Sequence, residues 1–424
     1  MSECIETLKK AKDKLFATGF FHIFGSNIIN QVIAFFSGVI LVRVLSKTEY
    51  GIYSYAYSII NFFLVFNGLG APSGLLQVCS ETADSTLQKL YYKIATKYAY
   101  SFDVILIIGL IITAEFVPLK MQGANEQLLV MSLLPITMAM FQLKSVYFRA
   151  TLKTKQFSYA NTGNAFAMFV FSVIGAVLYA AKGVVIGQTI AYMITAIFMG
   201  KICGNITVPD VDKRKKRDFI KISLVSAATN GVSQIMNMLD VFVLGLLIPN
   251  GAIVASYKVG ATIPTALAFI PNAIITYVYP YFARYKDDKE WTSNNYKKLL
   301  YLTAIINGSI ALMLVIMAPL IIRIVFGEQY MDSLAVFRIL SISFFFSGTL
   351  SGISGNLLVT QRKLKFNFWR AFVMGIANAI GNVVFISLWG AVGAAISTIT
   401  VSAISGMAAT LKMKAVIKSL PDKN

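Results

Sequence analysis

The chain has few charged residues: Asp, Glu, Lys and Arg make up 13% of its 424 residues, whereas 57% are apolar. Average soluble domains carry about 25% charged residues. This composition, with a mean hydropathy of +0.69, therefore excludes a soluble enzyme and a disordered chain. A membrane-spanning helix needs roughly 20 consecutive apolar residues, so the sequence predicts an all-α membrane protein with many spans.

Side chains that bind metals or act as catalytic bases are also scarce. His22 is the single histidine, and Cys4, Cys79 and Cys203 lie far apart, without the spacing of a metal motif. No stretch resembles the phosphate-binding pattern G-x-x-x-x-G-K-[ST], which argues against direct use of ATP. We expect no cofactor, no metal site and no enzymatic activity.

Long apolar runs separated by short connections predict twelve transmembrane helices. We place them at about 20–44, 51–77, 95–117, 127–148, 158–180, 184–203, 219–248, 252–281, 299–324, 333–359, 367–389 and 391–411. The longest connection, at 206–218, is basic. It divides the chain into an N-terminal six-helix lobe at 1–205 and a C-terminal six-helix lobe at 219–424.

The basic residues predict the orientation. Counted over alternate connections, 31 of the 38 Lys and Arg residues fall on the side that carries both termini. By the positive-inside rule that side is cytoplasmic, in a cell (inner) membrane. The cluster at 213–217 fits orientation and contact with membrane lipids better than binding of nucleic acid, which we do not expect as a partner.

The two halves resemble each other in sequence. Asn27 and Gln31 of the first span match Asn230 and Gln234 of the seventh, and Gly183 matches Gly390 before the last span of each half. The order of such matches is preserved. They predict an internal repeat with an axis along the membrane normal, and a substrate site between the two lobes.

Three stretches resemble signatures of a known family. These are Arg43–Tyr53 (RVLSKTEYGIY) with Gly68–Gly70 and Glu81, then Asp240–Gly245 with Tyr257 and Pro271, and finally Phe326–Tyr330. They are similar to bacterial polysaccharide flippases of the multidrug/oligosaccharidyl-lipid/polysaccharide exporter superfamily.

The resemblance implies movement of an undecaprenyl-pyrophosphate-linked glycan, such as an O-antigen or capsule repeat unit, from the inner to the outer leaflet. Polysaccharide polymerase and chain-length proteins would then be partners. Two alternatives stay open: a cation-coupled drug exporter of the same superfamily, and a membrane-embedded glycan polymerase or ligase.

Amide side chains in the spans are candidates for sugar binding. Asn27 and Gln31 in one lobe, and Asn230, Gln234 and Asn237 in the other, would line a hydrated cavity between the lobes. Tyr53 would stack on a sugar ring. The alternatives are amides that join helices by hydrogen bonds and a tyrosine of an interfacial belt.

Charged residues inside the spans are candidates for the pyrophosphate and for ion coupling. We expect Arg43 and Lys258 to bind the pyrophosphate, while Asp240 pairs with Lys258 or takes up the coupling ion. A purely structural Asp240–Lys258 pair is the alternative. A second structural pair is expected between Asp103 and Lys144, and Pro135, Pro264 and Pro271 should interrupt spans four and eight.

Overall fold

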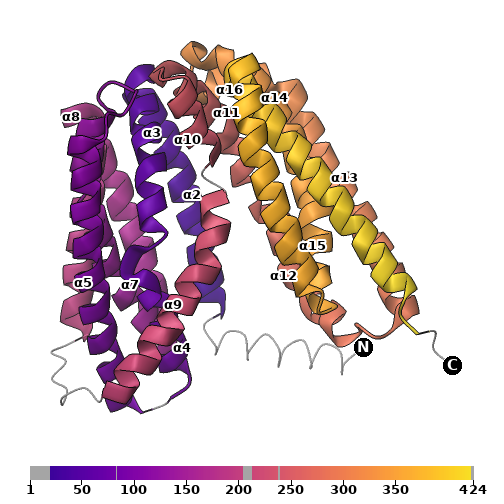
Figure 1. Ribbon diagram of the computed structural model, residues 1–424, viewed down its shortest axis with the longest axis horizontal. Coiled ribbons are helices and arrows are strands. Elements are labelled where there is room, and N and C mark those ends of the chain that lie inside the picture. Colours follow the sequence, from indigo (N-terminus) through magenta and orange to yellow (C-terminus); the bar gives the residue numbers. More distant parts are fainter. Residues whose placement is uncertain (1–19, 83, 204–212, 237–238, 422–424) are drawn as a thin grey trace. The chain divides into compact units, whose positions relative to one another are not determined.

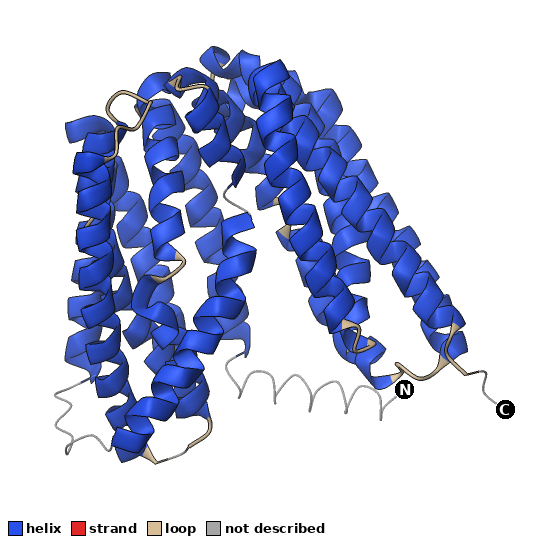
Figure 2. Cartoon of the chain, in the orientation of Figure 1, coloured by secondary structure: helices blue, strands red, loops and turns tan. Residues whose placement is uncertain are grey.

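The computed structural model describes residues 20–82, 84–203, 213–236 and 239–421, and this part of the chain is helical without a strand (Figure 2). Helices satisfy their own backbone hydrogen bonds, which is the requirement for crossing lipid. Nine helical stretches within the described residues are long and apolar enough to span a membrane. The predicted all-α membrane class is confirmed.

The chain forms two compact units, coloured from indigo to yellow along the sequence in Figure 1. The first takes in residues up to Glu49 together with Ala56–Ile235, and the second joins Tyr50–Tyr55 to the residues from Met236 onward. The predicted linker at 206–218 lies largely outside the described residues, so the expected lobe boundary stays a prediction.

Within the described residues the first unit consists of eight α-helices, apart from the Tyr50–Tyr55 turn of α3 that belongs to the second unit, and one short 3-10 turn. They are α2 (Phe20–Val44), α3 (Lys47–Leu64), η1 (Asn67–Gly70), α4 (Ala71–Ser80), α5 (Ser85–Phe116), α6 (Ala124–Met131), α7 (Leu134–Ala150), α8 (Thr154–Cys203) and α9 (Lys213–Met236). A core cluster joins α4, α5, α7 and α8 through residues such as Leu75, Ala95 and Phe148, and Phe219 of α9 also belongs to it.

The second unit continues the helical chain to its described end. Its elements are α10 (Leu239–Leu247), α11 (Gly251–Ala266), α12 (Phe269–Arg284), α13 (Lys289–Ile321), η2 (Ile322–Phe326), η3 (Glu328–Ser333), α14 (Leu334–Phe345), η4 (Phe346–Gly352), α15 (Ile353–Thr360) and α16 (Leu364–Lys418). Ile275, Phe282, Leu357 and Met413 pack in the core between α12, α15 and α16.

The two longest helices each turn back in the middle. The α8 ladder breaks at Ala180, with φ 50° and ψ −137°, and the α16 ladder breaks at Gly390, with φ 58° and ψ −134°. Three residues later, Gly183 abuts the carbonyl of Gly175, as Gly393 abuts that of Phe385. The equivalent of Gly183 in backbone geometry is therefore Gly393, three residues beyond the Gly390 that the sequence comparison paired with it.

Three other breaks interrupt the helices. Pro135 stands at the start of α7, and Pro264 and Pro271 flank the break between α11 and α12 at Leu267 and Ala268. The predicted interruptions of spans four and eight are thus present. The η1 break between α3 and α4 was not expected from the sequence, and it positions a buried acid described below.

Candidate functional site

The Arg43–Tyr53 stretch forms the junction between α2 and α3. The Ser46 hydroxyl caps α3 by accepting a hydrogen bond from the Glu49 backbone amide at 3.3 Å. The Glu49 carboxylate accepts one from the Ser46 backbone amide at 3.2 Å, which completes a capping box. Gly51 lies so close to Gly251 of α11 that a Cβ atom would collide with its carbonyl. Ser46, Glu49 and Gly51 of this signature therefore have structural roles.

The side chains proposed for substrate in the first unit are accessible. Arg43, in the last turn of α2, is exposed, as are Asn27 and Gln31 further up the same helix. By contrast, Asn30 Oδ1 is buried without a hydrogen-bond donor among the described residues. The exposed amides of Asn27 and Gln31 therefore do not form buried hydrogen bonds between helices of this unit.

Tyr53 lies in the turn of α3 that belongs to the second unit. It is half-buried, with its ring centroid 6.4 Å from that of the buried Tyr50. The structure does not describe the side chains of the matching amides. Only the backbone is described for Asn230 and Gln234, within α9, and Asn237 lies outside the described residues.

The expected pair between Asp240 and Lys258 is not formed. Asp240 lies on α10, and its Oδ2 atom accepts the Tyr257 hydroxyl of α11 at 2.8 Å. Neighbouring residues of a helix point about 100° apart, because a turn holds 3.6 residues. Tyr257 therefore takes the inward position, and Lys258 lies exposed, without an acidic partner among the described residues.

Asp240 instead lies among uncharged polar side chains. Together they form what we call the Asp240 cluster: Asp240, Tyr257, Asn378, Asn382 and Thr398. The amide of Asn382 donates to Oδ1 at 2.6 Å, and the Thr398 hydroxyl donates to Oδ2 at 2.9 Å. Asn382 also donates to Asn378 Oδ1 at 3.1 Å. The two halves of α16 supply all three of the Asn and Thr residues.

The Asp240 cluster has spare oxygen lone pairs in a buried place. Asn382 is fully buried, and its Oδ1 atom has no donor among the described residues. A carboxylate next to amide and hydroxyl oxygens is the kind of site that hard cations prefer. No group of three or more His, Cys, Asp or Glu residues gathers in the described part of the chain, so the oxygens here are mostly neutral.

Sequence reasoning identified Asp240 but missed Asn378, Asn382 and Thr398. The signal that could have found them is the pair of amides at i and i+4 in an otherwise apolar span, the same pattern that drew attention to Asn27 and Gln31. The distance of more than 130 residues along the chain to Asp240 is what hid the contact.

The expected pair between Asp103 and Lys144 is also absent. Lys144 Nζ donates to the carbonyl of Ala196 in α8 at 2.6 Å. Asp103 Oδ1 accepts the backbone amide of Gly68, in the η1 break, at 2.7 Å. The two side chains therefore bond to different neighbours.

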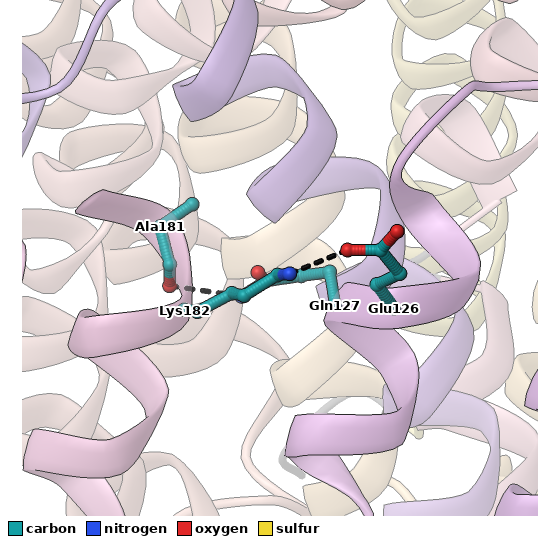
Figure 3. Close-up of polar contacts among 4 residues, drawn as sticks. All are labelled: Glu126, Gln127, Ala181 and Lys182. Carbon is teal, nitrogen blue, oxygen red and sulfur yellow. Dashed lines mark hydrogen bonds and ion pairs between the residues drawn. The ribbon is translucent and has the colours of Figure 1, made fainter. Parts of the chain in front are cut away.

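Two polar contacts join α6 and α8 at one end of the first unit (Figure 3). Gln127 donates to the carbonyl of Ala181 at 2.9 Å, just after the α8 break, and Lys182 forms an ion pair with Glu126. This end also carries the α5–α6 connection with Lys120, so Lys120 and Lys182 lie at the same end of the unit.

The fold first defines the class of protein: a helical membrane protein with the architecture of known flippases and exporters. The chain resembles the lipid II flippase MurJ in its inward closed conformation, with a TM-score of 0.73 over 94% of this chain and 88% of that one, at 16% identity. It also resembles a multidrug resistance MATE family transporter of the MOP superfamily in its inward-facing conformation. There the TM-score is 0.63 over 92% and 95% of the two chains, at 13% identity.

The family follows from the sequence comparison. The family model described as "Polysaccharide biosynthesis protein" matches residues 40–335, well over half of the chain. The chain therefore belongs to the polysaccharide biosynthesis protein family, and the resemblance seen in the signature stretches is confirmed.

Two curated relatives agree with this assignment. A membrane protein of Klebsiella pneumoniae, described as uncharacterized and in the cps region, is 26% identical over 398 residues, 89% of this chain and 77% of that protein. The lipopolysaccharide biosynthesis protein WzxC of Escherichia coli K12 is 30% identical over 158 residues, 35% of this chain and 30% of WzxC.

Proposed function

We propose that the protein is a flippase that moves a polyprenyl-pyrophosphate-linked oligosaccharide from the inner to the outer leaflet for surface polysaccharide synthesis. The observation that carries this proposal is the family match over residues 40–335, and the likeness of the fold to a lipid II flippase supports it. The relatives named in polysaccharide and lipopolysaccharide synthesis point to the same cargo class.

The proposed arrangement in the membrane has twelve spans in two six-helix lobes related by an internal repeat. Two of the nine long helical stretches, Thr154–Gly200 and Lys365–Lys418, each contain a break at a matching place, which supports counting them as two spans apiece. The distribution of basic residues supports an inner-membrane protein with both termini in the cytoplasm. Transport would proceed by alternating access.

Two cations are proposed to bind the pyrophosphate. Arg43 and Lys258 are both exposed, and Lys258 has no acidic partner among the described residues. A cation in a span is costly unless it pairs or meets water or a ligand. Asn27 and Gln31, with Asn230, Gln234, Asn237 and Tyr53, are proposed to contact the sugars.

The Asp240 cluster is proposed to take up the coupling ion. Its carboxylate is already held by three neutral donors, so it can stay ionised without a cationic side chain. The unpaired Asn382 Oδ1 would complete an oxygen shell around a small cation. The structural alternative is a polar network that only joins α10, α11 and α16.

Membrane lipids are the proposed contacts of the basic start of α9. Arg214, Arg217 and Lys221 line a surface hollow there together with Asp218. Such a cluster attracts anionic headgroups at the cytoplasmic surface. Polysaccharide polymerase and chain-length proteins are proposed as partners in the same pathway, because an exported repeat unit must next be joined to others.

The experiment that tests the function is deletion of the gene followed by analysis of lipid-linked oligosaccharides. The proposal expects complete lipid-linked repeat units to accumulate and surface glycan to disappear, with both defects corrected by the wild-type gene. An unchanged lipid-linked pool with raised sensitivity to cationic dyes would contradict the flippase and support the exporter alternative, which the likeness to MATE transporters favours.

A further inference from the structure

A second buried acid lies in the first unit, outside the proposed substrate and coupling residues. Asp103 is fully buried in α5, thirteen residues before the end of that helix, which is roughly 20 Å along its axis. Its Oδ1 atom accepts the Gly68 amide at 2.7 Å, but its Oδ2 atom has no donor among the described residues. An ionised carboxylate with one hydrogen bond in such a place is strongly disfavoured.

An unpaired acceptor stands at the same break. Asn67, adjacent to Gly68, donates its Nδ2 hydrogen to the Pro135 carbonyl at 2.7 Å, which fixes the orientation of the amide. Its Oδ1 atom is then buried with no donor in the described structure. Asp103 Oδ2 on α5 and Asn67 Oδ1 in the break are thus both buried acceptors without a hydrogen-bond donor among the described residues.

We propose that Asp103 binds a proton in the first unit, and that exchange of this proton with water accompanies movement of the η1 break during transport. In the described state the acid is neutral: Oδ1 accepts from Gly68, and the Oδ2 hydroxyl has a hydrogen to donate. The proton comes from bulk water and returns to it.

The neighbouring charges do not compensate Asp103. On α5 itself, Tyr100 is the titratable group that interacts with it. Of the helices packed against α5, α7 directs Lys144 to the Ala196 carbonyl, and α6 directs Glu126 to Lys182. On α4 the titratable group is Cys79, whose Sγ lies 3.7 Å from the Gln88 carbonyl. A proton is therefore the simplest neutraliser of this acid.

The break is suited to moving when the proton leaves. Gly68, Leu69 and Gly70 all have positive φ, at 58°, 42° and 76°, and this conformation is strained for Leu69, which has a Cβ. A strained backbone conformation persists only while surrounding contacts stabilise it, and the hydrogen bond from Gly68 to Asp103 is one of these contacts. Gly70 in turn abuts the Ser223 carbonyl of α9, so movement of the break reaches that helix.

Infrared spectroscopy of the purified full-length protein tests the proton directly. Wild type at neutral pH should show the C=O stretching band of a protonated carboxylic acid. Asp103→Asn should lose this band, and the matched Asp240→Asn variant should keep it, since the Asp240 carboxyl group already accepts three hydrogen bonds. An unchanged band in Asp103→Asn, or no such band in wild type, overturns the proposal.

Thermal unfolding against pH provides a second readout that needs no substrate. Because the folded state holds a proton that the unfolded chain releases, wild type should lose stability relative to Asp103→Asn as the pH rises. A difference that is the same at every pH overturns the proposal.

The transport part rests on the proposed function, and surface glycan tests it. Asp103→Asn, fixed in the neutral form, should fold but lose most export, and Asp103→Glu should restore part of it. Export at the wild-type level in Asp103→Asn would overturn the exchange step. Infrared spectroscopy and thermal unfolding still test the proton on Asp103 even if the cargo is not a lipid-linked glycan.

Discussion

Asp103 on α5 of the first unit and Asp240 on α10 of the second unit both accept hydrogen bonds from the protein, but the two carboxyl groups are held in opposite ways. Asp103 in the first unit is fully buried with one backbone donor, whereas Asp240 in the second unit accepts hydrogen bonds from Tyr257, Asn382 and Thr398. Hydrogen bonds donated to a carboxyl group favour its charged form, whereas burial without them favours the neutral form. The comparison therefore separates the proposed proton site at Asp103 from the proposed cation site at Asp240.

The largest stability effect is expected where the first unit holds the break next to Asp103. Gly70→Ala would keep an L-residue at φ 76° and push its Cβ into the Ser223 carbonyl, so we expect a loss of about 2–4 kcal/mol of unfolding free energy. Gly68→Ala, also at a positive φ of 58°, is the matched control, because its Cβ would meet only side-chain atoms of Ala99, Pro72 and Ala71, at 3.3 Å or more. Denaturant unfolding in detergent measures both; an equal loss in the two variants would contradict the role of the α9 contact.

The substitutions Asp240→Asn and Asp103→Asn should change the unfolding free energy in different ways. At position 240, an amide nitrogen would face hydroxyl and amide donors, and we expect a loss of about 1–3 kcal/mol. At position 103, the new amide donor meets a buried place that lacks donors, so the unfolding free energy at neutral pH should be unchanged or higher. Thermal unfolding measures both variants. If Asp103→Asn were less stable than Asp240→Asn, the contrast between the two acids would be wrong.

The breaks of α8 and α16 offer a smaller, symmetrical test. Ala180 and Gly390 share a backbone conformation that favours glycine, yet the first unit carries alanine there. Ala180→Gly should stabilise the protein and Gly390→Ala should destabilise it, each by about 1 kcal/mol. Stabilities that move in the same direction would show that the two breaks are not equivalent.

The smallest effect is expected at the exposed ion pairs. Lys182 and Glu126 are 50% and 70% exposed, and Arg323 and Glu328 in the second unit are 66% and 71% exposed. Water screens such pairs, so Lys182→Ala and Arg323→Ala should leave the melting temperature unchanged within error. A clear drop in either variant would mark that pair as a structural contact.

Composition and apolar patterning were sufficient to predict the helical membrane class, and short signatures were sufficient to predict the family. The breaks near Pro135, Pro264 and Pro271 followed from the loss of backbone donors at proline. The turns near Ala180 and Gly390 were predicted as well, although the pairing of the two halves shifted by three residues. Local chemistry encodes these features.

The partners of the buried charges could not be predicted in the same way. Depth in the membrane suggested Asp103 with Lys144 and Asp240 with Lys258, but depth does not fix the direction in which a helix turns each residue. Asn382 and Thr398 reach Asp240 from positions 142 and 158 residues away. The η1 break did have a local signal, because Asn67, Gly68 and Gly70 are residues that tolerate positive φ.

The most direct test of the account is the leaflet in which the lipid-linked glycan resides. In a deletion strain, lipid-linked repeat units should react with a membrane-impermeant glycan-oxidising reagent in inverted membrane vesicles but not in intact spheroplasts. The wild-type gene should restore reaction in spheroplasts, whereas Asp240→Asn at equal protein levels should not. Reaction in deletion-strain spheroplasts equal to that in wild type would contradict a flippase function for this protein.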